Sequence, residues 1–169
     1  MTVSKIYFDM DGVLADFDRG VVELCKMAPV DQAKKTKAQD DELFGKMRSV
    51  EHFYGELKPL PEALEMFFYI YEQLGDRCEI LSGIPKDYRG IVNAKTDKMD
   101  WVKRYLGEHI VSNIVYRAEK VKYCTGPECI LIDDFCHTIH EWKSLGGTGI
   151  LHTSPAKTLE ELRNLAVIR

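Results

Sequence analysis

Two pairs of aspartates stand directly after apolar, strand-like segments of the chain. Asp9 and Asp11 follow residues 6–8, and the pair Asp133-Asp134 follows residues 129–132. In an open sheet of parallel strands, ligands bind outside the carboxyl ends of the strands, so both pairs should face one crevice. Neighbouring carboxylates repel each other unless a cation or a proton relieves them, and Mg²⁺ takes such oxygen ligands. A single pair would also suit an exposed acidic turn, but two pairs favour a metal site.

Two further segments offer groups that bind phosphoryl oxygens. Ser82-Gly83 ends another strand-like run, and a hydroxyl followed by a glycine N–H can hold such oxygens. Lys120 opens a helix-like stretch, and a lysine there can neutralise charge on a phosphoryl group in transit. Taken singly, these residues are also typical of helix caps and surfaces.

The elements that must position these residues alternate between strands and helices. Short apolar runs predict strands at 6–8, 78–81, 113–116, 129–132 and 149–152. Helical spacing of apolar residues predicts helices at 61–74, 99–106, 138–145 and 158–165. Thr158 and Glu161 form a Thr-x-x-Glu capping box at the start of the last helix. This alternation predicts a Rossmann-like, three-layer α/β/α fold with a parallel sheet.

One long stretch, from Phe17 to Lys58, breaks the alternation, because it has helical patterning and no strand-like segment. We therefore expect an α/β core built from residues 1–16 and 59–169, with a small helical cap at 17–58.

Composition excludes several classes of protein. The chain has 169 residues, 45% of them hydrophobic and 30% charged, which is typical of a folded domain. Its net charge of -4 argues against a protein that coats a nucleic acid polymer. The longest apolar run, 66–71, is far shorter than the ~20 residues that span a membrane, and residues 1–5 lack the apolar region of a signal peptide. The sequence therefore predicts a cytoplasmic protein without membrane contact. It does not determine the oligomeric state.

In chain order, the motifs Asp9-x-Asp11-Gly-Val-Leu, Ser82, Lys120 and Asp133-Asp134 resemble those of the haloacid dehalogenase-like (HAD) phosphohydrolases. The resemblance covers nearly the whole chain. The acid at Asp11 points to the phosphatase branch, because the dehalogenase branch lacks an acid there.

Three segments, 9–17, 53–61 and 98–107, look more narrowly like the 5'(3')-deoxyribonucleotidases. The chain departs from that family at 82–86, where Ser-Gly-Ile-Pro-Lys replaces the usual Thr-Ser-Pro-x-Lys. The resemblance implies a magnesium-dependent phosphomonoesterase that acts on (deoxy)nucleoside monophosphates rather than on nucleic acid polymers.

The resemblance also implies roles for the acidic residues. Asp9 would be the nucleophile that forms an aspartyl-phosphate, and Asp11 would protonate the leaving alcohol and then activate water. Mg²⁺ would lie between Asp9, the backbone carbonyl of Asp11 and Asp133, with Asp134 orienting its waters.

The remaining implied roles concern the substrate. The residues expected to bind the phosphate are Ser82, Gly83, Lys120 and Lys86. Those expected to line the substrate pocket are Phe17, Phe44, Phe53 and Lys98, with the aromatic rings stacking on a base and the lysine adding positive charge at the rim.

Three alternatives stay open. The substrate of a HAD phosphatase can instead be another small ester, such as a sugar phosphate or phosphoglycolate. The chain can also be a non-catalytic, receiver-like or phosphate-binding module with an acidic pocket. A zinc module is a further alternative, with ligands from the set Cys124, Cys129, Cys136, His137 and His140.

Overall fold

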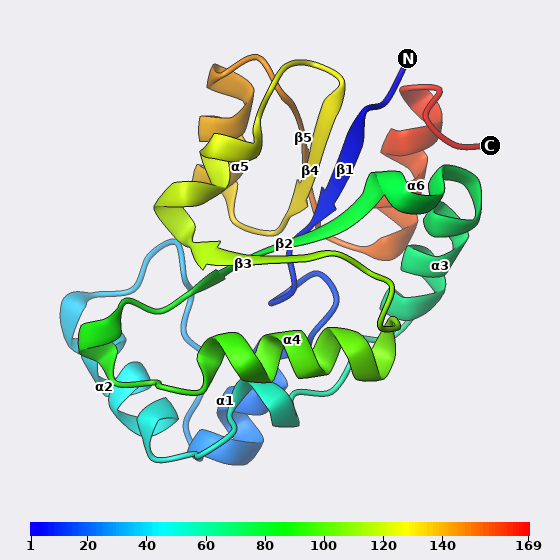
Figure 1. Ribbon diagram of the computed structural model, residues 1–169. Coiled ribbons are helices and arrows are strands. Elements are labelled where there is room, and N and C mark those ends of the chain that lie inside the picture. The colour runs from blue at the N-terminus through cyan, green and yellow to red at the C-terminus, as the bar shows by residue number, and fades with distance from the viewer.

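The computed structural model describes residues 1–169 and contains one parallel sheet of five strands (Figure 1). The strands are β1 (Lys5–Phe8), β2 (Cys78–Ile84), β3 (Ser112–Tyr116), β4 (Cys129–Asp133) and β5 (Thr148–Leu151). Their order in the sheet is β3-β2-β1-β4-β5, so β1 is central. The parallel α/β fold predicted from the alternating pattern is confirmed.

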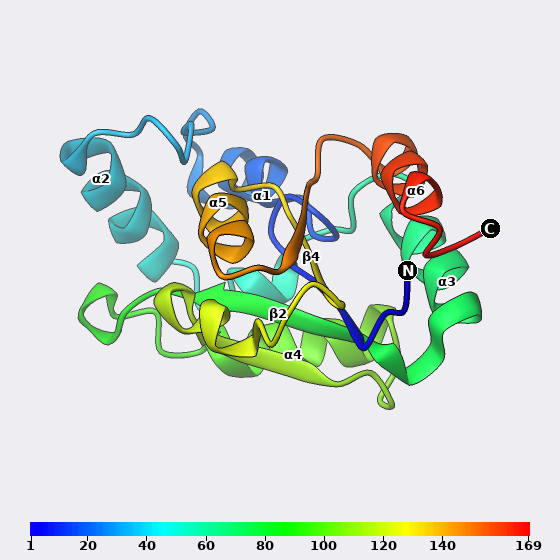
Figure 2. The ribbon, with the colours of Figure 1, turned by 90° about the horizontal axis from the view of Figure 1, so that it is seen from above.

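Helices cover both faces of the sheet. The α-helices are α1 (Phe17–Cys25), α2 (Lys37–Arg48), α3 (Ala63–Leu74), α4 (Ala94–Tyr105), α5 (Cys136–Ser144) and α6 (Pro155–Asn164). Alternate strand residues face opposite sides: Phe8 packs in the larger apolar cluster with α3, α4 and α6, whereas Tyr7 packs in a smaller cluster with α5. Figures 1 and 2 show α5 on the side of the sheet opposite α3 and α4. The sheet is therefore the middle of three layers.

Four short 3-10 helices complete the element list: η1 (Tyr54–Glu56), η2 (Gly75–Arg77), η3 (Asp87–Arg89) and η4 (Arg117–Tyr123). The last one follows β3 where the sequence predicts only a helix-like stretch.

The last helix begins earlier than the capping-box pattern predicts. Ser154 is its N-cap and accepts a hydrogen bond from the Lys157 N–H, and Pro155 occupies the first turn, where its fixed φ suits a helix. Thr158 is buried inside the helix, and its hydroxyl bonds the Nδ1 atom of His152 at 2.7 Å. The capping box at Thr158 was therefore a wrong prediction.

The chain between β1 and α3 forms α1, α2 and η1, which extend beyond the carboxyl ends of the strands (Figure 2). Leu43, Met47 and Phe53 from this segment belong to the same apolar cluster as the sheet. The Trp101 indole of α4 donates a hydrogen bond to the Leu57 carbonyl at 2.8 Å, so the return segment is tied to the rest of the fold. The division into a core and a cap stays a prediction. No helix has both the length and the apolar character that crossing a bilayer requires.

Candidate active site

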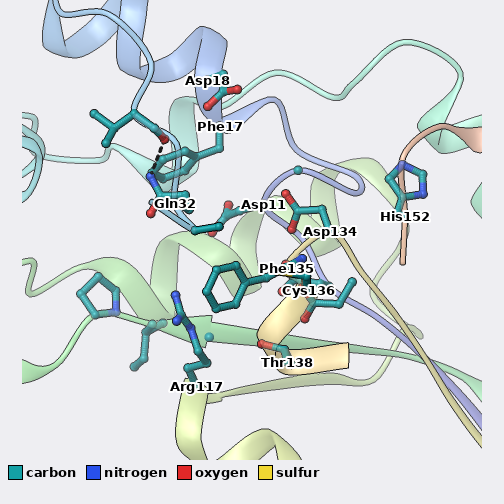
Figure 3. A pocket seen from close by; sticks show the side chains of 18 of the residues that line it. Asp11, Phe17, Asp18, Gln32, Arg117, Asp134, Phe135, Cys136, Thr138 and His152 are labelled. Carbon is teal, nitrogen blue, oxygen red and sulfur yellow. Dashed lines mark hydrogen bonds between the residues drawn. The ribbon is translucent and has the colours of Figure 1, made fainter. Parts of the chain in front are cut away.

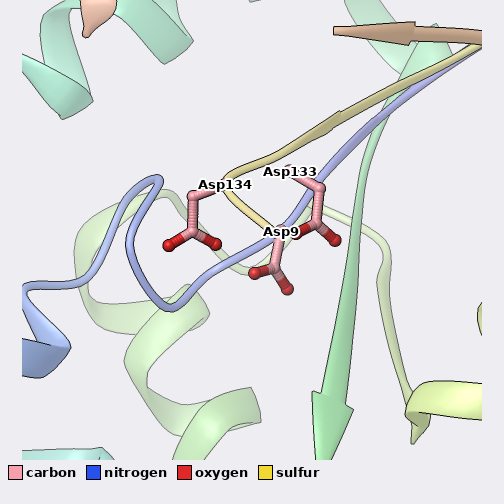
Figure 4. A group of neighbouring side chains, drawn as sticks. All are labelled: Asp9, Asp133 and Asp134. Atoms are coloured by element: carbon pink, nitrogen blue, oxygen red, sulfur yellow. The ribbon is translucent and has the colours of Figure 1, made fainter. Parts of the chain in front are cut away.

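The expected acidic crevice forms where β1 and β4 end side by side. Phe8 is paired with Ile132, and the Asp9 N–H donates to the Ile132 carbonyl at 2.9 Å, so the residues that follow each strand are held together. Carboxylate oxygens of Asp9, Asp133 and Asp134 lie within 4.8 Å of one another (Figure 4). Asp9 and Asp133 are buried, which makes their mutual repulsion strong unless a cation offsets it.

Lys120 provides one such offset. Its Nζ atom donates to Asp9 Oδ1 and to Asp133 Oδ2, both at 2.8 Å, and its side chain is buried. Burial lowers the pKa of Lys120, but the charges of Asp9 and Asp133 outweigh that effect and leave it raised. The lysine is therefore protonated and holds the Asp9 carboxylate in one orientation.

Lys98 pairs with Asp11 as Lys120 pairs with Asp9. Its Nζ atom donates to Asp11 Oδ2 at 2.7 Å, to Ser82 Oγ at 2.9 Å and to the Gly83 carbonyl at 2.7 Å. The Tyr54 ring lies 4.5 Å from the ammonium group and favours its charge. Lys98 is completely buried, so the structure places it beneath the site and not at the rim, where the sequence analysis put it.

Burial raises the pKa of Asp11, and Lys98 opposes that shift. The second oxygen of this carboxylate, Oδ1, is buried and accepts no hydrogen bond from the protein. The Asp11 side chain as a whole is partly exposed and borders the cavity described below. A carboxyl group with a raised pKa next to an ionised one is the arrangement that acid–base catalysis uses.

Gly12 allows the chain to turn directly after the first acidic pair, four residues beyond the end of β1. Its φ of +79° lies in the left-handed region, which glycine adopts without strain. A Cβ atom at this position would lie 1.9 Å from Asp134 Oδ2. The glycine therefore makes room for the Asp134 carboxylate beside Asp9.

The carboxylate oxygens of Asp9, Asp133 and Asp134 fit a hard divalent cation. Lys120 occupies one oxygen of Asp9 and one of Asp133, and the Phe135 N–H donates to Asp133 Oδ1 at 2.9 Å. Burial and the charges of Asp9, Asp133 and Asp11 raise the pKa of Asp134, which a bound cation would reverse. The donors are all oxygens, as Mg²⁺ prefers.

The acids border a cavity of about 1210 Å³ that reaches from the strand ends to the segment containing α1 and α2 (Figure 3). Five of the residues expected to contact substrate line this cavity: Phe17, Phe44, Gly83, Lys86 and Lys120. Ser82 does not, because it is fully buried and its hydroxyl accepts from Lys98.

Phe53 also lies outside the cavity, so the prediction that it lines the substrate pocket was wrong. Its ring is completely buried and packs edge-on against Phe17, with 5.6 Å between ring centroids. It supports the Phe17 ring from behind and is a core residue. Phe44, in turn, has the Arg89 guanidinium 4.6 Å from its ring centroid, so part of its surface is already engaged.

The zinc alternative finds no support in the structure. The metal-capable side chains that gather within one group are all aspartates, Asp9, Asp133 and Asp134. Cys129 is buried in β4, whereas Cys136 is exposed at the start of α5.

Arg117 and Phe135 are among the cavity-lining residues that the sequence analysis missed. The Arg117 guanidinium lies 4.2 Å from the Phe135 ring centroid. One signal was available: Arg117 precedes Lys120 by three residues, which is one turn of a 3-10 helix.

Comparisons with known proteins identify the fold. The chain has the three-layer fold of HAD-type hydrolases in solved structures. A hydrolase from Pseudomonas syringae has a TM-score of 0.53 at 18% identity, covering 95% of this chain and 89% of that one. A HAD family hydrolase from Deinococcus radiodurans R1, with bound phosphate and sodium, has a TM-score of 0.54 at 14% identity, covering 98% and 97%. The L-2-haloacid dehalogenase from Xanthobacter autotrophicus has a TM-score of 0.53 at 13% identity, covering 96% and 83%.

The similarity in sequence to a curated protein covers less of the chain than the similarity in fold. The "Putative 5'(3')-deoxyribonucleotidase" of Vibrio phage KVP40 is 29% identical over 115 residues, which cover 68% of this chain and 58% of that protein. The match thus spans less than two thirds of the relative's length. No protein-family model matches the chain. The comparisons establish the HAD-like fold that the motifs predict.

Proposed function

We propose that the protein is a magnesium-dependent phosphomonoesterase that acts through an aspartyl-phosphate. The observation that carries the proposal is the pairing of two acids with two buried lysines at the strand ends. Lys120 fixes Asp9, and Lys98 fixes Asp11. Displacement of a halide needs neither the second acid nor the group of three aspartates, so both features favour phosphoryl transfer over dehalogenation.

Asp9 supplies the nucleophile in this proposal. One of its oxygens is held by Lys120, which leaves the other to attack phosphorus. The new oxygen–phosphorus bond forms as the bond to the leaving alcohol breaks. Lys120 and the Gly83 N–H stabilise the transferring oxygens in this step.

Asp11 carries the proton in both half-reactions. Its carboxyl group, which borders the cavity, delivers a proton to the leaving alcohol oxygen, and the resulting carboxylate then takes a proton from the water that cleaves the acyl-phosphate. Lys98 keeps the carboxyl group in place for both steps.

The metal would be held by Asp9, Asp133 and the backbone carbonyl of Asp11, with Asp134 orienting its waters. When bound, Mg²⁺ neutralises the charge that builds up between a phosphate dianion and Asp9.

The proposed substrate is a (deoxy)nucleoside monophosphate. The cavity offers the Phe17 ring to a base, and the phage relative carries a nucleotidase name. A second candidate is another small phosphate ester, because the cavity is large enough for several. The cytoplasmic location that the sequence predicts stays a prediction.

Removal of divalent metal should abolish turnover. We expect hydrolysis of an aryl phosphate to stop in excess EDTA and to return when Mg²⁺ is restored, because Asp9 and a phosphate dianion repel each other without a cation. Ca²⁺ should bind without supporting turnover, since its larger, looser coordination misplaces the reacting atoms. Phosphate release measured before and after chelation checks this. Full activity in EDTA would exclude the metal site.

A substrate screen separates the candidate esters. We expect kcat/KM for deoxynucleoside monophosphates to exceed that for sugar phosphates and phosphoglycolate at least about tenfold, or ~1.4 kcal/mol of differential transition-state binding. Release of phosphate across such a panel, with 2-haloacids added and halide measured, gives the comparison. If sugar phosphates win, the nucleotidase proposal fails and the phosphatase proposal survives. Halide release without phosphate release would overturn both.

A further inference from the structure

Two basic side chains that line the cavity have no carboxylate partner. The other three are paired with aspartates: Lys120 with Asp9 and Asp133, Lys35 with Asp40, and Arg89 with Asp40 and Asp41. Arg117 and Lys86 form no ion pair. The acid closest to Lys86 in the chain, Asp87, instead accepts a hydrogen bond from the Tyr116 hydroxyl at 2.7 Å.

Arg117 and Lys86 lie just beyond the ends of two adjacent strands, β3 and β2. Ile84 of β2 is paired with Tyr116 of β3, so Arg117 and Lys86 follow directly at the edge where the acids gather. Both are exposed, as groups at the mouth of a cavity should be.

The position of Arg117 relative to the reacting centre follows from the helix that carries it. Arg117 and Lys120 are three residues apart in η4, and in a 3-10 helix such residues lie on the same face, about 6 Å apart along the axis. The Phe135 ring, next to the Arg117 guanidinium, limits its movement, and the Phe135 N–H is bonded to Asp133. Figure 3 shows the Arg117 side chain rising beside Phe135 within the pocket.

We propose that Arg117, with Lys86, forms a second anion subsite, which binds a phosphate or carboxylate that the substrate carries besides the phosphate being hydrolysed. The inference rests on the proposed phosphomonoesterase function and narrows its substrate class. A guanidinium presents a planar set of donors that matches either anion. Among nucleotides, a deoxynucleoside 3',5'-bisphosphate has this chemistry. Among smaller esters, phosphoglycolate has it.

The charges elsewhere in the cavity leave few other places for a second anion. Asp16, Asp18 and Asp31 line the side formed by α1 and the segment after it. These acids repel a second negative group, so the ends of β2 and β3 are the favourable side.

The test compares esters that differ only in the second anion. One pair is deoxyadenosine 3',5'-bisphosphate against deoxyadenosine 5'-monophosphate, and the other is phosphoglycolate against ethyl phosphate. We expect the doubly anionic member of at least one pair to have at least a tenfold higher kcat/KM, and the pair that shows it distinguishes phosphate from carboxylate.

Arg117→Met should lower that preference at least tenfold, and Arg117→Lys should retain part of it. Lys122→Met, in the same helix but exposed, is the control and should leave the preference unchanged.

Equal kcat/KM within both pairs, or a preference that survives in Arg117→Met, would overturn the subsite while the phosphatase proposal stands. If no ester is hydrolysed, the proposed function fails instead. Calorimetric binding of the bisphosphate to the wild type and to Arg117→Met then decides the subsite separately: weaker binding in the variant supports it, and equal binding contradicts it.

Discussion

Asp9→Asn should lower kcat by roughly three orders of magnitude or more, because the amide keeps the shape of the carboxylate and loses its nucleophilic charge. Asp9 lies at the end of the central strand, and Lys120 fixes one of its oxygens at 2.8 Å. The amide oxygen can still accept that hydrogen bond, so the variant should fold. Initial rates of aryl phosphate hydrolysis, with thermal unfolding measured in parallel, check the expectation.

Asp100→Asn is the matched control for this substitution. Asp100 is exposed on α4, away from the cavity, and the same chemical change there should leave the rate unaltered. A folded Asp9→Asn protein with near-normal turnover would move the nucleophile to another residue.

Lys120→Met should damage both activity and stability. The substitution leaves the buried Asp9 and Asp133 carboxylates without their shared cation, and removing one partner of a buried ion pair costs about 3–5 kcal/mol of unfolding free energy. It also removes a donor to the transferring phosphate, which should lower kcat about 10²–10³-fold. Denaturant unfolding and steady-state kinetics on the same preparation measure the two effects.

Lys122→Met separates the role of Lys120 from a general effect of losing a lysine. Lys122 lies on the same 3-10 helix, is largely exposed and pairs only with Glu119, so its loss should change unfolding free energy by less than about 0.5 kcal/mol. If Lys120→Met proved as stable as Lys122→Met, the buried pairs of Lys120 with Asp9 and Asp133 would not stabilise the fold.

The fold and the acidic cluster could be predicted from sequence because both follow from local patterns. Short apolar runs marked all five strands, and an acid placed directly after a buried strand must emerge at the carboxyl edge of the sheet. Asp9, Asp133 and Asp134 therefore meet for a reason that the chain displays residue by residue.

The role of Lys98 could not be predicted in this way. It reaches Asp11 across 87 residues of sequence, from a helix that covers the sheet, and only tertiary packing shows that contact. The same holds for Phe53, an aromatic residue whose burial behind Phe17 depends on how the segment after β1 folds back. Arg117 was missed for a different reason, because a 3-10 helix as short as η4 leaves little periodic apolar pattern to detect.

The start of α6 shows two local signals in competition. Thr158 and Glu161 match a capping box, but Ser154 followed by Pro155 is the pair that begins the helix. The buried bond between Thr158 and His152 then uses the hydroxyl that the capping box would have needed.

Chemical trapping shows whether catalysis passes through a phosphorylated Asp9. Asp11→Asn lacks the group that activates water, so the acyl-phosphate should accumulate. An aryl phosphate is the substrate of choice, because its leaving group departs without help from an acid. The variant is mixed with it and Mg²⁺, quenched in acid, digested, and read by peptide mass spectrometry. We expect one added phosphoryl group on the peptide that contains Asp9, located on Asp9 itself. A burst of released aryl alcohol with the phosphoryl group on another residue, or on none, would contradict it.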